Sequence, residues 1–356
     1  MTHFNHHFCH PIQCIVPPHL SESIKLRGDA QQKQMIDEME VQASNFRAAR
    51  LAAPSSFLAA KAIGPNAGLQ GPDRKVYDAQ NTFTLPGQLV RSEGEPRVPG
   101  DDAVNEAYRG AGATYRLYRK AFKRDSLDGN GMPLISTVHV GNSYNNAFWN
   151  GSQMAYGDGD GVIFQKFTEL SVIAHELSHG VVQFSGGLIY QDQSGALNES
   201  FADVFGSLTL QYRRRQRPHR ASWLVGEGIL GPNINGEALR SMKAPGTAYD
   251  DALLGVDPQP FHMDNYVVTS SDHGGVHINS GIPNHAFYLL SNYLGGRAWR
   301  KPGKIWYDTM QQINNPHCTF VQWADKTVEV ARTLFGPGSR EVMFTRRAWK
   351  LVGISV

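Results

Sequence analysis

Two histidines four residues apart, His175 and His179, lie in the run SVIAHELSHGVV, whose composition is typical of an apolar helix. Side chains at this spacing project from the same face of a helix, so both imidazoles point the same way. Glu176 lies on the adjacent face, and Glu199 follows 20 residues after His179. Two imidazoles and a carboxylate, with one coordination position left open, form the ligand set of a catalytic zinc ion.

This ligand set favours hydrolysis by an activated water. Zinc held by the three side chains would lower the pKa of a coordinated water to about 7. Glu176 is placed to take the proton and to hand it to a leaving amine. The remaining nitrogen of each imidazole needs a hydrogen-bond partner. We expect Asp203, four residues after Glu199, and Asn198 to serve in this way.

A tetrahedral intermediate also needs donors for its negatively charged oxygen. The segment SSDHGGVHINSG provides His277, with Asp272 five residues earlier to orient its ring. The segment GGLIY provides Tyr190 between the two ligand-bearing segments. Interpreted from its residues alone, His277 is more often a structural histidine of a core than a catalytic group.

The elements that must position these groups divide the chain into two lobes. Strand-like runs occur at 76–96, 134–140 and 161–167, and one amphipathic helix at 101–122. Beyond Glu199 the patterns are mainly helical. A chain of 356 residues exceeds the size of a single core. We therefore expect an α+β fold, with a β-rich lobe at 71–184 that includes the zinc helix, a helical lobe at 185–356, and the site in the cleft between them.

Residues 1–70 have the pattern of an N-terminal appendage. Residues 1–20 are rich in histidine and proline without periodicity, which is typical of a flexible tail, although Cys- and His-rich tracts also bind metals. Residues 21–51 follow helical spacing, with Ser21 as the cap. The stretch 54–75 is rich in Gly, Pro and Ala, as linkers are. We expect a short segment joined to the globular body by a cleavable linker.

Composition and charge argue against several classes of protein. A formal net charge of +2 gives no general attraction to nucleic acid or to an anionic membrane. The basic run RRRQRPHR at 213–220 follows an apolar helical stretch, so we interpret it as a solvated helix end, with a nucleic-acid or heparin patch as the alternative. Three cysteines cannot form a disulfide framework. Because neither a membrane-spanning run nor a secretory signal is recognisable, we expect unconventional export or retention in the cytoplasm.

Several segments resemble, in the same order, those of the thermolysin family of zinc endopeptidases. They are SYNNAFWNGSQMAYGDGDG, HELSHGVV, GLIYQDQSGALNES, ADVFG, LRSM and GGVHINSGIPN, and the resemblance covers about residues 75–353. It implies zinc on the three ligands above and Glu176 as general base and proton shuttle. It also implies oxyanion support from Tyr190 and His277, with Asp272 orienting His277.

The resemblance extends to substrate binding. It implies that Asn146, Ala147 and Arg240 hold the substrate backbone and that Asp203 supports a zinc-bound histidine. The family prefers a bulky apolar residue just after the scissile bond, and the matching pocket positions are all apolar here, namely Phe164, Phe167, Val172 and Leu239. Because an apolar pocket discriminates by only about 1–3 kcal/mol per methylene, we expect broad proteolysis.

One departure from the family pattern concerns calcium. Secreted members carry a double calcium site of acidic residues, and only Glu227 is retained here. Four matching positions lack a carboxylate, namely Ser171, Leu210, Ser222 and Leu224. Calcium needs several oxygen ligands, so we expect the double site to be lost. The acids of DGDG, with Glu93 and Glu95, leave a weaker calcium site open.

The other departure is the short N-terminal segment, with a pair of prolines in VPPHL at 16–20. It resembles the short-propeptide, protealysin-like branch of the family. That resemblance implies an inhibitory propeptide removed autocatalytically, since a tethered segment reaches the cleft at high effective concentration. A plain disordered extension is the alternative. The family as a whole also implies secretion.

Two rival interpretations are an aminopeptidase and a catalytically inactive binding module. No acidic motif for a substrate's α-amino group is recognisable, which argues against the first. All side chains that the chemistry requires are present, which argues against the second. We therefore expect an endopeptidase acting on proteins and peptides, while its natural substrates and oligomeric state are left open.

Overall fold

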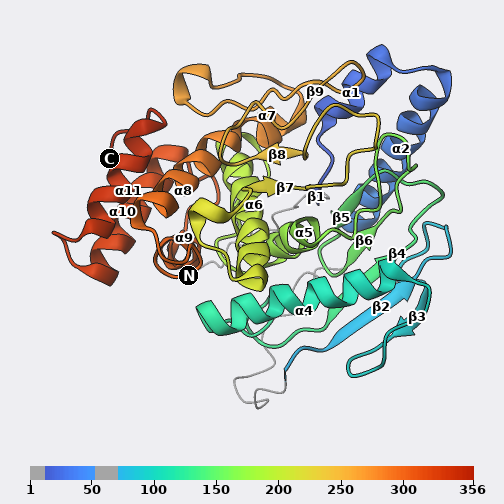
Figure 1. The fold of residues 1–356 in the computed structure, drawn as a ribbon, viewed down its shortest axis with the longest axis horizontal. Helices are drawn as coiled ribbons and strands as arrows, with labels where there is room; N and C mark the ends of the chain where they lie inside the picture. The colour runs from blue at the N-terminus through green and yellow to red at the C-terminus, as the bar shows by residue number, and fades with distance from the viewer. Residues whose placement is uncertain (1–12, 53–70) are drawn as a thin grey trace, which may run out of the picture.

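Two lobes meet at a pair of buried central helices in the computed structural model, which describes residues 13–52 and 71–356. A six-stranded sheet lies on one side of these helices and a helical lobe on the other (Figure 1). The fold is therefore α+β, as expected. No helix in the described part of the chain is long and apolar enough to cross a membrane.

The sheet of the first lobe has the strand order β1-β5-β6-β4-β2-β3. Its strands are β1 (Gln13–Cys14), β2 (Arg74–Asp78), β3 (Gln88–Arg91), β4 (Leu134–Val138), β5 (Ala147–Trp149) and β6 (Met154–Tyr156). β2, β4 and β6 run parallel, whereas β3 and β5 pair antiparallel with their neighbours. The edge strand β1 comes from the N-terminal appendage and pairs antiparallel with β5.

Helix α4 (Asp102–Phe122) packs against this sheet through one strongly apolar face. Its start is fixed by Asp101, whose side chain accepts a hydrogen bond from the Val104 amide. It ends at Lys123, which adopts a left-handed conformation with φ 62°.

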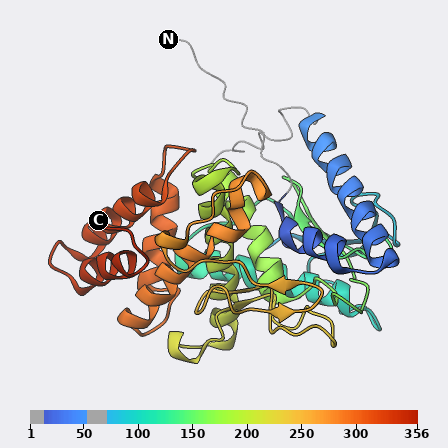
Figure 2. The same ribbon diagram turned by 90° about the horizontal axis from the view of Figure 1, so that it is seen from above.

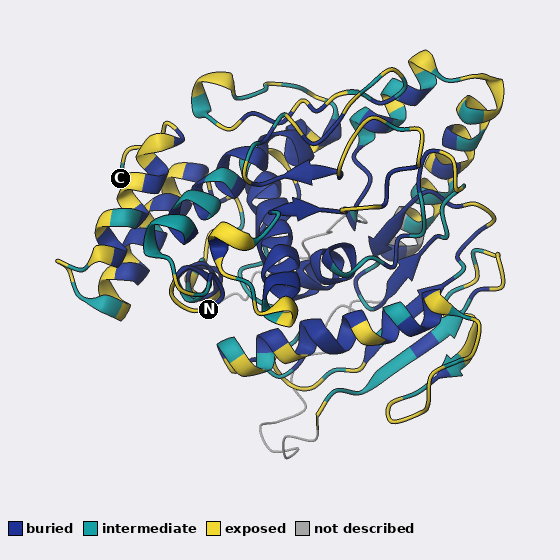
Figure 3. Cartoon of the chain, in the orientation of Figure 1, coloured by how far each residue is buried: buried dark blue, intermediate teal, exposed yellow. Residues whose placement is uncertain are grey.

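The two central helices are α5 (Leu170–Gln183) and α6 (Asp192–Arg214). Both are buried along nearly their whole length, as their dark colour in Figure 3 shows. They approach closely because Gly206 of α6 faces α5. A Cβ atom at this position would lie only 2.7 Å from the carbonyl oxygen of Ser171.

The second lobe consists mainly of helices that pack around α6. They are α7 (Asp272–Asn279), α8 (Gly281–Leu294), α9 (Lys301–Gln312), α10 (Phe320–Phe335) and α11 (Arg340–Leu351). Between α6 and α7 the chain forms two short two-stranded sheets, from β7 (Leu224–Val225) with β8 (Arg240–Ser241), and β9 (Asp250–Asp251) with β10 (Gly255–Val256). The expected helical lobe is thus confirmed.

The N-terminal appendage forms β1 and two helices, α1 (Pro18–Arg27) and α2 (Ala30–Ala52). Figure 2 shows both helices, in blue, lying against the body of the molecule. The prediction of one helix capped by Ser21 was wrong. Pro18 starts α1 because its fixed φ suits the first turn. The chain then breaks at Gly28, where it turns into an extended conformation.

Two further expectations from sequence were wrong. The predicted tail at 1–20 is ordered from Gln13 onward, because β1 gains main-chain hydrogen bonds from β5. The expected strand at 161–167 is a loop, in which only Phe164 forms an isolated bridge, to Leu230. Residues 1–12 and 53–70, with most of the histidine-rich tract and most of the proposed linker, lie outside the described residues.

Candidate active site

The side chains of His175, His179 and Glu199 converge at the interface of α5 and α6. Their ligand atoms all lie within 4.8 Å of one another. The Nε2 atoms of the two histidines are 3.0 Å apart, and each lies 3.4 Å from an oxygen of Glu199. All three side chains are fully buried. The helical spacing of four residues thus brings both imidazoles to one face, as predicted.

The chemistry of this cluster fits a zinc ion. Two imidazole nitrogens face each other, and the Glu199 Oε2 atom is buried without a hydrogen-bond partner. Burial lowers the pKa of His179 to about 3, so its imidazole is neutral as a metal ligand must be. Two imidazoles and a carboxylate are a common ligand set for catalytic zinc. Among the described residues, no other group of three such side chains is close enough to share an ion.

The outer nitrogens of both histidines have the partners expected from sequence. His175 Nδ1 lies 2.8 Å from Asp203 Oδ1, and His179 Nδ1 lies 2.9 Å from Asn198 Oδ1. In each case the ring is held with its Nε2 atom toward the cluster. Asn198 is itself fixed through its amide nitrogen, which donates to the Leu188 carbonyl at 3.1 Å.

Asp203 has a second role that the sequence did not indicate. Arg240 donates to it from Nε and Nη2 at 2.9 Å, and Asn284 donates to it at 2.8 Å. Although burial alone would raise the pKa of Asp203, Arg240 and His175 lower it to about 2. The carboxylate is therefore ionised and couples His175 to Arg240. The contact of Asn284 with Asp203 could not be predicted from the sequence, because no local spacing relates the two residues.

Glu176 is fully buried beside the three-residue cluster. Its Oε2 atom accepts a hydrogen bond from the Trp149 amide at 3.0 Å, whereas its Oε1 atom has no partner. Burial, and next the charge of Glu199, raises the pKa of Glu176 well above its usual value. Glu176 therefore holds a proton more readily than a solvent-exposed glutamate does.

Tyr190 and His277 lie on the other side of the cluster. The Tyr190 hydroxyl donates to Glu199 and lies 3.1 Å from His277 Nε2. His277 Nδ1 lies 2.6 Å from Asp272 Oδ1. Burial opposes the charged imidazole, but the charges of Asp272 and Glu199 prevail and raise the pKa of His277 to about 9. His277 is thus a cationic donor held by Asp272.

A left-handed turn positions Asp272 for this contact. Residues 272–275 all have positive φ, between 50° and 84°. Gly274 and Gly275 supply half of this turn without strain, and a Cβ atom on Gly274 would lie 2.0 Å from Asp192 Oδ1. The turn directs Asp272 Oδ2 onto the His277 amide at 2.8 Å. The glycine pair is therefore required by the geometry of the site.

The N-terminal appendage runs through the cleft in an extended conformation. The Ile15 amide donates to the Ala147 carbonyl at 3.1 Å, and the Val16 amide donates to Asn146 Oδ1 at 3.2 Å. Arg240 Nη1 donates to the Ile15 carbonyl at 3.2 Å. All three residues predicted to hold a substrate backbone therefore hold the appendage instead.

The preceding carbonyl points at the catalytic groups. His277 Nε2 lies 3.0 Å from the Cys14 carbonyl oxygen. The peptide bond between Cys14 and Ile15 therefore lies among the groups predicted to act on a scissile bond. A cleft of about 650 Å³ remains along the appendage, lined by Val16 and Pro18 on one side and by Tyr190 and His277 on the other.

The residues predicted to form the apolar pocket are all buried. Phe164, Phe167 and Val172 are 0% exposed and Leu239 is 2% exposed. They belong to the same buried cluster as Ile15, which is also 0% exposed. The rings of Phe164 and Phe167 lie 5.7 Å apart in a tilted arrangement. The side chain of Ile15 is therefore buried within the apolar core.

The fold and this site define a two-lobed zinc hydrolase whose ligands lie on two adjacent helices. The model "Thermolysin metallopeptidase, catalytic domain" matches residues 60–183, and "Thermolysin metallopeptidase, alpha-helical domain" matches residues 186–354. The chain belongs to the thermolysin family of metallopeptidases, so it is a zinc-dependent peptidase. The sequence-based assignment is confirmed.

Its relatives support the short-propeptide branch. An extracellular metalloprotease of Pectobacterium carotovorum subsp. carotovorum is 45% identical over 348 residues, 97% of each chain. Protease PrtS of Photorhabdus sp. (strain Az29) is 53% identical over 287 residues, 80% of this chain and 76% of that protein. The structure of the protealysin precursor of Serratia proteamaculans matches with a TM-score of 0.85 and 44% identity, over 96% of this chain and 100% of that chain.

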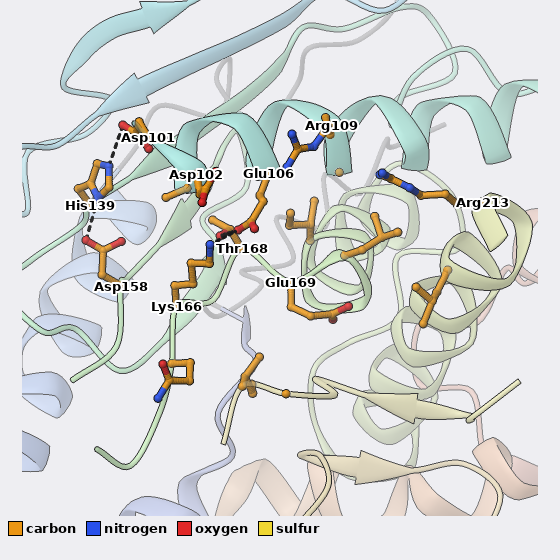
Figure 4. Close-up of a pocket in the computed structure, with 18 of the residues that line it drawn as sticks. Asp101, Asp102, Glu106, Arg109, His139, Asp158, Lys166, Thr168, Glu169 and Arg213 are labelled. Atoms are coloured by element: carbon orange, nitrogen blue, oxygen red, sulfur yellow. Dashed lines mark hydrogen bonds and ion pairs between the residues drawn. The ribbon is translucent and has the colours of Figure 1, made fainter. Parts of the chain in front are cut away.

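A cavity of about 1060 Å³ lies beside the start of α5 (Figure 4), and of the four positions expected to have lost a calcium ligand only Leu210 lines it. Glu169 points into this cavity. Its Oε2 atom already accepts hydrogen bonds from the Ser171 and Val172 amides, at 2.7 and 3.2 Å. Arg213 and Lys166 also line it. Four further acidic residues line it as well, namely Asp101, Asp102, Glu106 and Asp158, so the loss of the double calcium site stays a prediction.

The acidic residues that could form a weaker calcium site already interact with other protein groups. Asp158 contacts His139 at 2.7 Å, and Asp160 accepts hydrogen bonds from backbone amides at 2.7 to 3.1 Å. Glu93 pairs with Arg74, and Glu95 accepts from the Ser92 amide at 2.5 Å. Each of these carboxylates therefore already has a partner.

Proposed function

We propose that this peptidase cleaves internal peptide bonds, with Glu176 as general base, His277 and Tyr190 as donors to the developing oxyanion, and Asp272 as the group that keeps His277 charged. When bound to its three ligands, zinc supplies the Lewis acidity that makes water nucleophilic near neutral pH. Glu176 takes the proton of the attacking water and returns it to the leaving amine. His277 then neutralises charge on the former carbonyl oxygen.

One observation carries this proposal. The Cys14–Ile15 peptide is bound through both of its ends, with the Cys14 carbonyl oxygen 3.0 Å from His277 Nε2 and the Ile15 amide 3.1 Å from the Ala147 carbonyl. These contacts support a substrate backbone that binds in the same way. Asn146 and Arg240 are then substrate-binding residues, which fix the chain on both sides of Ile15.

The cleft supports a preference for a bulky apolar residue just after the scissile bond. Ile15 occupies that place in the appendage and is fully buried. We infer that Phe164, Phe167, Val172 and Leu239 shape the pocket. A peptide library cleaved by the mature enzyme should show enrichment of Leu, Ile, Phe and Val at this place. A flat profile there would contradict the proposed pocket.

Replacing Glu176 tests the proposed mechanism. Glu176→Ala removes the base and leaves the zinc ligands in place, so casein hydrolysis should fall by at least about a hundredfold. If the propeptide is removed autocatalytically, the variant should also stay full length in mass spectrometry. The exposed Glu329→Ala serves as the matched control and should behave as wild type. Casein hydrolysis by Glu176→Ala at the wild-type rate would contradict the assignment.

We further propose that residues 1–70 are an inhibitory propeptide with its linker, and that 71–184 and 185–356 are the two lobes of the mature enzyme. Support comes from β1, which adds to β5 where a substrate would bind. Leu20, Ile24 and Ile36 of the appendage are also 0% exposed. Release therefore has to overcome main-chain pairing and apolar burial together.

Ile15→Asp tests inhibition by the propeptide. A charge in this apolar environment costs the side chain's burial energy, about 2–3 kcal/mol, and the desolvation of the carboxylate. The intact Ile15→Asp chain should therefore hydrolyse a peptide substrate at least about tenfold faster than the intact wild-type chain. Val41→Asp, at a position on α2 that is 57% exposed, is the control and should stay inhibited. Equal inhibition of the intact Ile15→Asp chain and the intact wild-type chain would contradict the proposal.

We also propose that the enzyme acts outside the cell, as its Pectobacterium relative is extracellular. Chelator-sensitive proteolysis should then be found in the medium of the producing cells. Activity confined to the cell lysate would contradict this location.

A further inference from the structure

A second cavity, separate from the catalytic cleft, is lined mainly by arginines. It has a volume of about 500 Å³ and lies between α4, the end of α6 and the loop that precedes α9. Five arginines and no acidic residue line it, namely Arg116, Arg213, Arg215, Arg297 and Arg300. It shares no lining residue with the cleft that holds β1. We call it the arginine pocket.

The arginines of this pocket lack acidic partners. Within residues 13–52 and 71–356, none of the five forms an ion pair with a carboxylate. Arg297 alone has a protein acceptor, since it donates to the Arg215 carbonyl that ends α6. That bond neutralises the negative end of α6 and leaves four guanidinium groups for a ligand.

The like charges of these arginines repel one another and an anion would relieve that repulsion, although four of the five are exposed to solvent, namely Arg116, Arg213, Arg215 and Arg300. Burial, and then the charges of Arg74 and Arg213, lowers the pKa of Arg116. The formal charge of the whole chain is +2, and it would be −3 without the five arginines. The five arginines thus place five formal positive charges around one concave region.

Aromatic side chains pack together in the wall of the pocket. Trp299 is 9% exposed, and its ring meets that of Tyr212 edge-on at 5.4 Å. The Arg297 guanidinium lies over the Trp299 ring, 5.4 Å from its centre. Arg300 stands at the N-cap of α9, where the helix dipole also favours an anion. Arg213 reaches from α6 toward α4 (Figure 4).

We propose that the arginine pocket binds a ligand with several adjacent phosphate groups, either a free oligophosphate or the phosphorylated headgroup of a lipid. Guanidinium groups recognise phosphate through paired hydrogen bonds, and several of them in one cavity match several charges in a small volume. An extended acidic peptide spreads its charges too widely for a cavity of about 500 Å³. The site is separate from the proposed proteolysis, so either proposal can fail alone.

Calorimetric titration with sodium tripolyphosphate tests the site. The protein is the full-length chain with Glu176→Ala, which avoids self-cleavage, in buffer with sodium chloride at physiological strength. We expect one tripolyphosphate per chain. The double variant Arg213→Gln/Arg300→Gln should raise the Kd about a hundredfold, because two charge-assisted contacts are lost.

The matched control is Arg332→Gln/Arg346→Gln, which removes two exposed arginines of α10 and α11 that line neither cavity. This variant should bind as wild type. Equal weakening in the two double variants would show attraction by net charge only and would overturn the proposal, as would absence of binding to the wild-type chain. Thermal melting of each variant establishes that it is folded.

Two further measurements separate the sources of phosphate. Retention on phosphatidylcholine vesicles that contain phosphatidylinositol bisphosphate, but not on phosphatidylcholine alone, would assign the site to a lipid headgroup. Binding of tripolyphosphate without vesicle retention would assign it to a free oligophosphate. Tighter binding of a single-stranded oligothymidylate, lost in the same arginine variant, would overturn the small-ligand proposal in favour of nucleic acid.

Discussion

At the scale of single residues, two buried aspartates each link a histidine of the site to another group. Asp203 joins His175 to Arg240, so one carboxylate links the metal site to the arginine that we propose binds substrate. Asp272 joins the left-handed turn at the start of α7 to His277, whose Nε2 atom faces the Cys14 carbonyl. Both aspartates are buried, so each pair acts in a low dielectric where its charges matter most.

Replacing His277 tests its role as oxyanion donor. His277→Gln should lower kcat by roughly a hundredfold to a thousandfold, about 2.7–4 kcal/mol, while KM changes little, because the donor acts on charge that develops in the transition state. The measurement uses enzyme freed of its propeptide by limited tryptic cleavage. The exposed His317→Gln is the control. A raised KM at unchanged kcat would mean that His277 only binds substrate.

At the scale of elements, the appendage is held by an edge strand and by polar contacts from α1. His19 Nε2 lies 2.9 Å from the Tyr249 hydroxyl, and Ser271 donates to Glu22 at 2.6 Å. Burial lowers the pKa of His19 to about 4, against the opposing charge of Asp272. Docking of the propeptide therefore favours a neutral histidine at this place.

This pKa predicts that acid weakens propeptide docking. Because the docked pKa lies below the free value of 6.5, the stabilisation is present above pH 6.5 and is lost as the pH falls toward 4. Between pH 7 and pH 5 the loss is at most about 2 kcal/mol. Urea unfolding of the full-length Glu176→Ala chain should show it.

The comparison for this prediction is Glu176→Ala/His19→Gln. Its unfolding free energy should fall less between pH 7 and pH 5 than that of Glu176→Ala. His317→Gln in the same background should leave the pH dependence unchanged. Parallel pH profiles for the two chains with and without His19 would exclude this histidine as the cause.

At the scale of the whole molecule, the metal ties the two lobes together. Its ligands come from α5, which follows the sheet of the first lobe, and from α6, around which the second lobe packs. An ion that binds only the folded chain stabilises it by about 4 kcal/mol at a thousandfold excess over Kd. The loss of the double calcium site stays a prediction from the sequence, based on Ser171, Leu210, Ser222 and Leu224.

Selective metal removal tests both statements. A zinc chelator should abolish casein hydrolysis and lower Tm, and added zinc should restore both. A calcium-selective chelator, with zinc replenished, should leave both unchanged, because Ser171, Leu210, Ser222 and Leu224 replace the expected carboxylates. A strong fall of Tm on calcium removal alone would show that a calcium site exists after all.

The sequence by itself determined the metal ligands and the long helices. His175 and His179 are related by helical spacing, and periodic apolar residues mark α4, α10 and α11, so local geometry suffices for both. It also determined the order of the family motifs. Spacing of this kind depends on neighbours within one helix and not on the rest of the fold.

Only the tertiary structure decided what those groups touch. The sequence does not predict β1, because a strand of two residues is too short to show an alternating pattern. It forms through pairing with β5. The contact of Asn284 with Asp203 joins positions 81 residues apart, and the arginine pocket joins α4, α6 and the loop before α9. Such contacts come from long-range packing, which no local spacing encodes. The metal site can therefore be predicted from the sequence, whereas the binding of the N-terminal segment in the cleft cannot.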